Sequence, residues 1–128
     1  MNDPTSRYPF LCLGEALVDW VCLDRTLDLH RATTFAKAPG GAPANVAVGL
    51  ARLAQGTGQG VRFLGGFSTD LLGPWLREVL EREGVDLSLS PAIAESATRN
   101  AYVLTGEDGN RVFLGFSTQR CADALLSV

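Results

Sequence analysis

The sequence has no apolar stretch of 18 residues, no cluster of basic residues and a single histidine, His30. Without such a stretch no membrane-spanning helix is predicted, and the early charges at Asp3 and Glu15 do not fit a secretory signal. Eleven basic against fourteen acidic residues give a net charge of −3, which argues against a nucleic-acid partner. One histidine alone completes neither a metal site nor a catalytic triad, so no metal ligands are predicted in this chain.

Cysteine is also scarce, and the three cysteines are Cys12, Cys22 and Cys121. Their number is odd and no two form a Cys-x-x-Cys pair, which argues against a disulfide framework and a zinc site. We therefore expect buried thiols and a cytoplasmic protein, because the cytoplasm keeps thiols reduced.

The rest of the composition is that of one globular domain. Apolar residues make up 46% of the 128 residues and charged residues 20%, which is enough to build a core and too apolar for a disordered chain. No repeat, low-complexity tract or domain boundary interrupts the chain.

Hydrophobic patterning alternates between strand and helix and predicts an α/β fold. Residues 38–43 form the densest cluster of helix and strand breakers, and 107–110 carry a hairpin turn. Residues 24–34 read as a loop with a weak strand. The expected helices are 45–54 and 71–83, and the expected strands are 10–14, 18–23, 61–67, 98–105 and 111–116.

The segment from Gly40 to Asn45 (GGAPAN) is the first candidate binding feature. Two glycines before a helix allow close approach of a ligand to the backbone, and the helix start presents free N–H groups. Asn45 could aim its amide at the same ligand, which could be a phosphate, a carboxylate or a sugar. The alternative is a Gly-Gly turn that only leads into the helix.

Two carboxylates, Glu15 and Asp19, follow the first strand, where ligands of open α/β sheets gather. Asp19 stands in an otherwise apolar segment, and burial of an unpartnered carboxylate is costly. It is therefore either exposed at a sheet edge or hydrogen-bonded, and paired sugar hydroxyls would suit it. An acid–base pair of the two carboxylates is a further possibility.

Together these segments resemble the N-terminal part of the ribokinase-like (PfkB) carbohydrate kinase family, and the fructokinases in particular. The resemblance rests first on residues 14–19 (GEALVD) and 40–47 (GGAPANVA). It continues to residue 126 through short motifs: Phe63-Leu64-Gly65, Asp70-x-x-Gly73, residues 83–86, residues 98–103, residues 109–113 and Ala122-Asp123. Residues 67–70 depart from the Gly-Asp that the family usually has at this junction.

The resemblance implies a ribokinase-like, doubly wound sheet with a small β lid, of which residues 1–128 are the N-terminal part of a single kinase domain. The lid would come from about residues 19–36 and 98–116, and it could form a homodimer contact. The sugar-binding residues would be Asp19, Gly40, Gly41 and Asn45, with Arg99 and Tyr102 approaching from the lid.

The activity implied is ATP-dependent phosphorylation of a sugar hydroxyl, with fructose favoured and Mg²⁺ accompanying ATP. The Gly-Ala-Gly-Asp motif that carries the family's catalytic base does not occur in the sequence. We therefore expect no catalytic or ATP-binding residue in this chain, and expect the chain alone to be inactive. A non-catalytic sugar-binding remnant, and a nucleoside or another sugar as substrate, are the alternatives.

Overall fold

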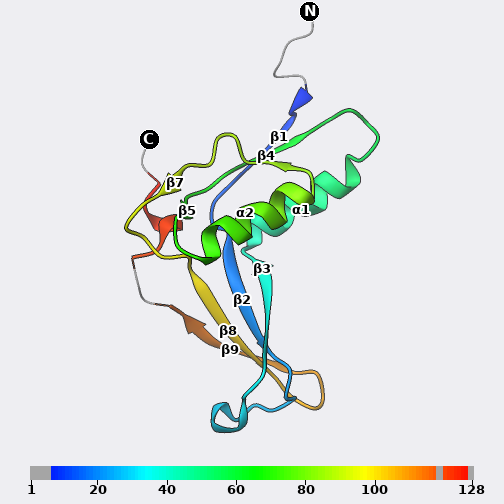
Figure 1. Ribbon diagram of the computed structural model, residues 1–128. Helices are drawn as coiled ribbons and strands as arrows, with labels where there is room; N and C mark the ends of the chain where they lie inside the picture. Colours follow the sequence, from blue (N-terminus) through cyan, green and yellow to red (C-terminus); the bar gives the residue numbers. More distant parts are fainter. Residues whose placement is uncertain (1–6, 118–119, 127–128) are drawn as a thin grey trace, which may run out of the picture.

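The computed structural model describes residues 7–117 and 120–126. Figure 1 shows two helices packed beside a short parallel sheet, with a longer twisted sheet extending away from them. The helices are α1 (Ala42–Leu53) and α2 (Leu72–Arg82), with short 3₁₀ turns at Leu29–Arg31 and Ala122–Ala124. The α/β class expected from the sequence is confirmed.

The parallel sheet has the order β1 (Phe10–Leu13), β4 (Val61–Leu64) and β6 (Val85–Asp86). Its strands bury alternate side chains beneath the two helices, as half-buried strands do. The core that results contains the strand residues Cys12, Val61, Phe63 and Val85 and the helix residues Ala47, Leu76 and Leu80. A short parallel pair, β5 (Phe67–Ser68) and β7 (Ala92–Ile93), lies beside it.

Helix α1 starts three residues before the predicted position, and Pro43 lies in its first turn. Proline suits that turn because the N–H it lacks would have no helical partner there. Alanines form the face that contacts the sheet, so α1 packs close to it. Arg52 at the end of α1 and Glu83 at the end of α2 then join the helices through two hydrogen bonds of 2.7 and 2.8 Å.

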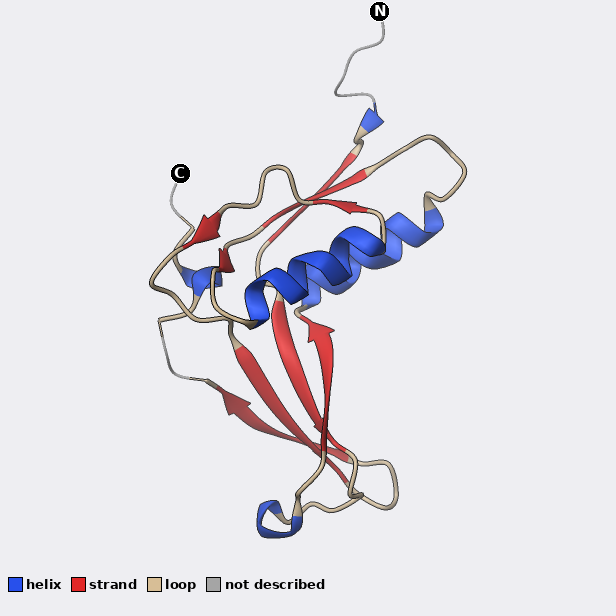
Figure 2. Ribbon diagram, viewed as in Figure 1, coloured by secondary structure: helices blue, strands red, loops and turns tan. Residues whose placement is uncertain are grey.

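The second sheet has the order β3 (Phe35–Gly40), β2 (Leu17–Cys22), β8 (Asn100–Thr105) and β9 (Arg111–Phe116). Strand β2 pairs antiparallel with β3 and parallel with β8, and β8 and β9 form the predicted hairpin. Segments far apart in sequence thus lie side by side in one mixed sheet (Figure 2).

Two predictions about extended segments are wrong. Residues 38–40 belong to β3 and are not a turn; Pro39 is tolerated because β3 is an edge strand in the described sheet, where a missing N–H costs no ladder bond. The expected strand 61–67 is divided into β4 and β5 at Gly65 and Gly66. A Cβ at Gly66 would collide with the carbonyl oxygen of Ala122, so the close approach of the C-terminal segment requires glycine there.

Asp70 ties α2 to the start of β8. Its Oδ1 accepts hydrogen bonds from the N–H groups of Leu72 and Gly73 and from the Thr98 hydroxyl, at 2.7–3.0 Å. Its Oδ2 accepts one from the Thr98 N–H at 2.7 Å. Burial raises the pKa of Asp70, but these hydrogen bonds outweigh burial and hold the pKa below its usual value.

Replacing Asp70 by alanine should lower the free energy of unfolding at pH 7 by about 1–3 kcal/mol, because buried donors lose their acceptor. The depressed pKa makes this stabilisation present above the unfolded-state pKa of about 3.9 and lost as pH falls through the folded-state pKa. Urea unfolding at pH 7 and pH 3 measures both effects. A loss in Asp70→Ala that is equal at the two pH values would contradict the role of the charge.

Candidate functional site

The Asp19 carboxylate stands in the middle of the four-stranded sheet. Its neighbours across the sheet are Ala38 on β3 and Ala101 on β8. No hydrogen bond or ion pair reaches this carboxylate from the described residues, although it is half-buried. Burial raises the pKa of Asp19 above its usual value, because water is removed from the charged form. Both oxygens of this carboxylate are therefore available to accept hydrogen bonds from a ligand.

The glycines that precede α1 allow the chain to pass close to Asp19 and Glu15. A Cβ on Gly40 would collide with the Asp19 carboxylate. Gly41 has φ of 101°, a conformation that favours glycine, and a Cβ there would lie 2.6 Å from the carbonyl oxygen of Glu15. The fold therefore requires glycine at both positions: Gly40 leaves room for the Asp19 carboxylate, and Gly41 allows the close approach of the Glu15 backbone.

Asn45 lies exposed in the first turn of α1, where its backbone N–H donates to the Gly41 carbonyl at 2.9 Å. With Gly40 it lines a cleft of about 320 Å³ between the two helices. Gly40 is thus common to both places: it lies against the Asp19 carboxylate and lines the cleft that contains Asn45, whereas Asp19 and Gly41 do not line that cleft.

Arg99 precedes β8 and its carbonyl accepts a hydrogen bond from the Val18 N–H at 2.9 Å. Its guanidinium Nε donates to Asp123 at 2.7 Å, and its Cζ lies 5.6 Å from the centre of the Phe116 ring. Asp123 is only 10% exposed. Hydrogen bonding to Asp123 raises the pKa of Arg99 further, and the nearby Glu15 charge acts in the same direction.

Tyr102 is not brought to the candidate site. It is paired with Trp20, one residue beyond Asp19, and successive residues of a strand point to opposite faces. Tyr102 and Asp19 therefore lie on opposite faces of the sheet.

The aromatic residue across from Asp19 is Phe116, which the sequence analysis did not select. Ala101 pairs with Asp19 on one side and with Phe116 on the other, so all three side chains share one face. The Phe116 ring packs against Phe113 at 4.8 Å between ring centres. No signal in the sequence singles out Phe116, because the register of the β8–β9 hairpin contains a bulge beside Tyr102.

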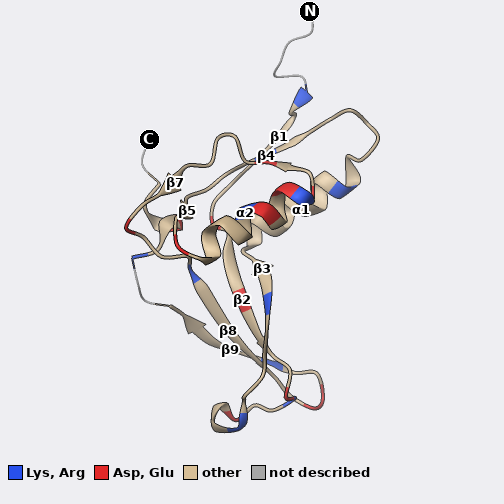
Figure 3. Ribbon diagram, in the orientation of Figure 1, with Lys and Arg blue, Asp and Glu red and all other residues tan. Residues whose placement is uncertain are grey.

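Charge is sparse on the four-stranded sheet, as Figure 3 shows. Within β2 the one charged residue is Asp19, and within β3 it is Lys37. The Lys37 ammonium lies 3.9 Å from the centre of the Trp75 ring on α2, and Lys37 pairs with Trp20 on the face opposite Asp19. Asp19 thus has no cation beside it on either neighbouring strand.

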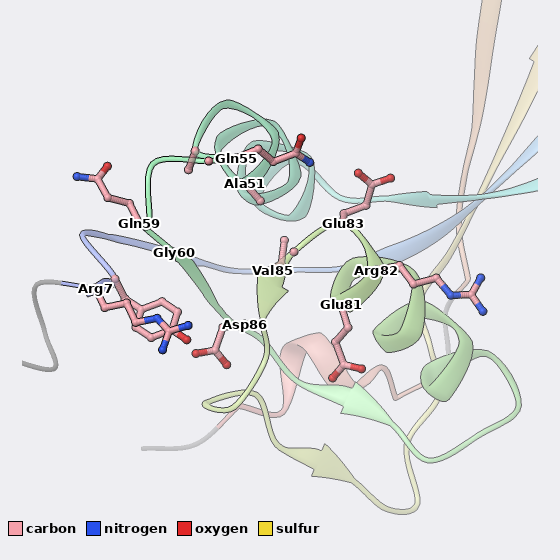
Figure 4. A pocket seen from close by; sticks show the side chains of 15 residues that line it. Arg7, Ala51, Gln55, Gln59, Gly60, Glu81, Arg82, Glu83, Val85 and Asp86 are labelled. Carbon is pink, nitrogen blue, oxygen red and sulfur yellow. The ribbon is translucent and has the colours of Figure 1, made fainter.

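A cavity of about 610 Å³ lies at the other end of the parallel sheet (Figure 4). It is an open basin lined by both acidic and basic side chains, among them Glu81, Asp86, Arg7 and Arg82, and none of the predicted site residues lines it. Ligands of parallel sheets bind at the carboxyl ends of the strands. This basin lies where β4 and β6 begin, which leaves the Asp19 region as the candidate site.

Within residues 7–117 and 120–126, no group of three or more His, Cys, Asp or Glu side chains is arranged to hold a metal ion. No helix of this part of the chain is long and apolar enough to cross a bilayer. All three cysteines are buried.

The chain thus combines an α/β core with a helix start preceded by two glycines and, beside it, a carboxylate that has no partner among the described residues. The family model "pfkB family carbohydrate kinase" matches residues 10–122. The chain belongs to this family, and its fold is the ribokinase-like fold of these sugar kinases.

Individual relatives of the chain agree with this family assignment. A probable fructokinase-7 of Arabidopsis thaliana is 40% identical over 91% of this chain and 32% of its own length. The crystal structure of fructokinase from Xylella fastidiosa matches with a TM-score of 0.76 and 32% identity, covering 94% of this chain and 35% of that one. The same fructokinase with bound ATP matches with a TM-score of 0.72. The chain spans about a third of the length of these relatives.

Replacing Asp19 by asparagine should raise the free energy of unfolding at pH 7. The folded-state pKa of Asp19 is raised, so its ionised form costs stability above that pKa, and the cost disappears as pH falls below the unfolded-state pKa of about 3.9. Urea unfolding of Asp19→Asn and the natural chain at pH 7 and pH 3 measures the difference. Glu107→Gln, at an exposed loop, is the control and should change nothing. Destabilisation by Asp19→Asn at pH 7 would reveal a favourable partner for the charge.

Proposed function

We propose that this chain supplies the sugar-binding part of an ATP-dependent kinase that phosphorylates a sugar hydroxyl, with fructose the favoured substrate. The observation that carries the proposal is the half-buried Asp19 carboxylate, which has no partner among the described residues and lies beside the glycine-bracketed start of α1. The fructokinase names of the relatives support the substrate.

Each residue of the proposed site has a different role in binding the sugar. The Asp19 carboxylate accepts hydrogen bonds from two neighbouring hydroxyls, a pairing that suits its two oxygens. Gly40 and Gly41 let the sugar approach the backbone, and the Asn45 amide offers both a donor and an acceptor. Phe116 provides an apolar ring face on the same side of the sheet as Asp19. Arg99, held by Asp123, borders this face.

The four-stranded sheet is the lid over the sugar in this proposal. The segments expected to form it, about residues 19–36 and 98–116, contain most of β2, the start of β3 and all of β8 and β9, together with the loop that joins β2 to β3. Covering the sugar would exclude water, which strengthens each hydrogen bond to the Asp19 carboxylate. Tyr102, on the other face, has no part in sugar binding.

ATP and Mg²⁺ would be held by the portion of the kinase that this chain does not supply. The described residues offer no metal-binding cluster, and no Gly-Ala-Gly-Asp motif occurs in the sequence. When bound, ATP supplies the phosphoryl group. The chain's own part is to bind and orient the sugar, and we assign the whole enzyme to the cytoplasm from its buried thiols.

The alternative is a chain without catalytic function that retains sugar affinity. Both hypotheses allow the 128-residue chain to bind fructose, which titration calorimetry measures. The kinase test below is therefore needed as well to separate them. Sugar binding without activity in any longer form would favour the alternative. If the kinase test showed a preference for a nucleoside over fructose, the kinase proposal would stand and the proposed substrate would change.

The kinase proposal is tested in a chimera that joins residues 1–128 to the remaining two-thirds of the Arabidopsis relative. Asp19→Ala should lower kcat/KM for fructose by about 10- to 150-fold, because a hydrogen bond to a charged group contributes about 1.5–3 kcal/mol. A coupled assay of ATP consumption gives the rates.

Glu107→Ala, at the exposed tip of the same sheet, is the matched control and should leave the rates unchanged. Equal melting temperatures of the variants separate a binding defect from unfolding. Unchanged kcat and KM in Asp19→Ala would remove Asp19 from the site.

We also propose that the four-stranded sheet forms a homodimer contact. Phe113 and Phe116 pack on each other and are half exposed, together with Val112 and Leu114 on the same strand. Exposed apolar patches of this kind mark interaction surfaces.

Sedimentation equilibrium of the chimera tests this contact. Phe113→Lys should weaken the dimer by at least about tenfold, because a charge would be placed in an apolar interface. Leu53→Lys, at an exposed apolar position on α1, is the control. A monomer at all concentrations would refute the contact.

A further inference from the structure

Asp123 is a buried ionisable group that the proposed sugar contacts do not use. Its side chain is 10% exposed, and the one hydrogen bond that it accepts among the described residues comes from the Arg99 Nε at 2.7 Å. Its other carboxylate oxygen, Oδ1, is buried without a partner. Removing a carboxylate from water is costly, so within the described part of the chain Asp123 depends on the Arg99 cation for compensation.

The backbone fixes this pair at the start of β8. Ala97 forms a parallel bridge with Cys121, and two hydrogen bonds of 2.9 Å hold the two segments together there. Arg99 and Asp123 each lie two residues beyond the bridge, on neighbouring segments. The bridge therefore brings the two side chains within reach of each other.

The cation of this pair reaches the face of the sheet that carries Asp19. The Arg99 Cζ lies 5.6 Å from the centre of the Phe116 ring, and Phe116 shares a face with Asp19. The Arg99 side chain is 25% exposed, and its terminal nitrogens Nη1 and Nη2 donate to no acceptor among the described residues. The guanidinium therefore borders the proposed sugar site with two nitrogens able to donate to a ligand.

Asp123 decides the net charge that a ligand meets at this border. An ion pair with so deeply buried a partner is little screened by salt, so Asp123 cancels most of the Arg99 charge. The remaining carboxylates are Asp19, on this face, and Glu15, whose charge acts on Arg99. Lys37 lies on the opposite face. With Arg99 neutralised, the balance of charge around the site is negative and opposes a ligand that carries a carboxylate.

We propose that Asp123 is a specificity-determining residue: by neutralising Arg99 it makes the site select a neutral sugar over a sugar acid. The hydroxyls of a neutral sugar still accept hydrogen bonds from Nη1 and Nη2, whereas a carboxylate meets the Asp19 and Glu15 charges without a net cation to bind it. Selection of this kind is a difference between two affinities, reached by disfavouring the wrong ligand. The inference rests on the proposed function and adds to it a residue that does not contact the sugar.

A purely structural role for Asp123 predicts a different result. Loss of one partner of a buried ion pair destabilises a protein whichever ligand is present. Such a loss lowers activity toward all sugars alike. Only a change in relative preference therefore identifies a role in specificity.

The test compares fructose with 2-keto-D-gluconate, in which a carboxylate replaces the C1 hydroxymethyl group of fructose. We measure kcat/KM for both in the chimera that contains residues 1–128. Asp123→Asn leaves Arg99 uncompensated and should move the ratio of the two kcat/KM values toward the sugar acid by about tenfold or more, because an unpaired cation attracts the carboxylate. A ratio that stays within about twofold of the parent would overturn the proposal.

Matched variants separate charge from packing. Asp123→Glu retains the charge and should retain the parent ratio. Asp123→Asn combined with Arg99→Gln removes both charges and should lose the shift. Asp86→Asn breaks the 3.2 Å ion pair with Arg62 at the other end of the parallel sheet, and it should lower stability without changing the ratio. A shift in Asp86→Asn equal to that in Asp123→Asn would show that instability alone changes the preference, and it would also overturn the proposal.

A titration that reads no activity keeps the proposal testable even where Asp123→Asn does not fold. In the 128-residue chain the NMR resonance of the Arg99 Nε–H group reports its hydrogen bond to Asp123. Added 2-keto-D-gluconate should leave this resonance in place in the natural chain and should shift it in Asp123→Asn. A shift in the natural chain, or none in a folded Asp123→Asn chain, would overturn the proposal.

These outcomes are distinct from those of the proposed function. A chimera that phosphorylates neither ligand defeats the proposed function and leaves the titration to decide this inference. A chimera that phosphorylates fructose, with an unchanged ratio in Asp123→Asn, retains the function and defeats the inference.

Discussion

The close contact between Gly40 and the Asp19 carboxylate is the constraint on which the site depends. A carboxylate in an apolar sheet is costly, and here the neighbouring strands contribute only small side chains, Ala38 and Ala101, beside it. The absence of a side chain at Gly40 is what lets the carboxylate remain in place. Loss of hydration raises the pKa of Asp19, so the charged carboxylate does not stabilise this fold.

The two sheets are joined so that this carboxylate stays beside the helix start. β1 leads through Glu15 into β2, and Gly41 packs against the Glu15 backbone as it begins α1. On the other side, Asp70 holds the start of α2 to Thr98 just before β8. Both connections act through hydrogen bonds and close backbone contacts. Such directional contacts fix the orientation of the four-stranded sheet relative to the helices better than apolar packing alone.

The parallel sheet, by contrast, is well packed on one side only. Its helix-covered face is buried, whereas Leu11 and Leu13 on the other face are more than half exposed. Parallel sheets owe their stability to cover on both faces, so this part of the fold is the one that gains most from a partner. The same geometry connects stability to function, because the carboxyl end of β1 lies at the candidate site.

The sequence by itself determined the α/β class, both helices, the β8–β9 hairpin and the family, because these depend on local periodicity, turn residues and short motifs. It also selected Asp19 and the Gly40-Gly41 pair, since a charge in an apolar run and a double glycine stand out without any structure. Tertiary structure alone decided that residues 38–40 form an edge strand, that Arg99 pairs with Asp123, and that Phe116 rather than Tyr102 shares the face of Asp19. Register is the physical reason: a shift of one residue reverses the face of every side chain, and the bulge beside Tyr102 arises from pairing between strands.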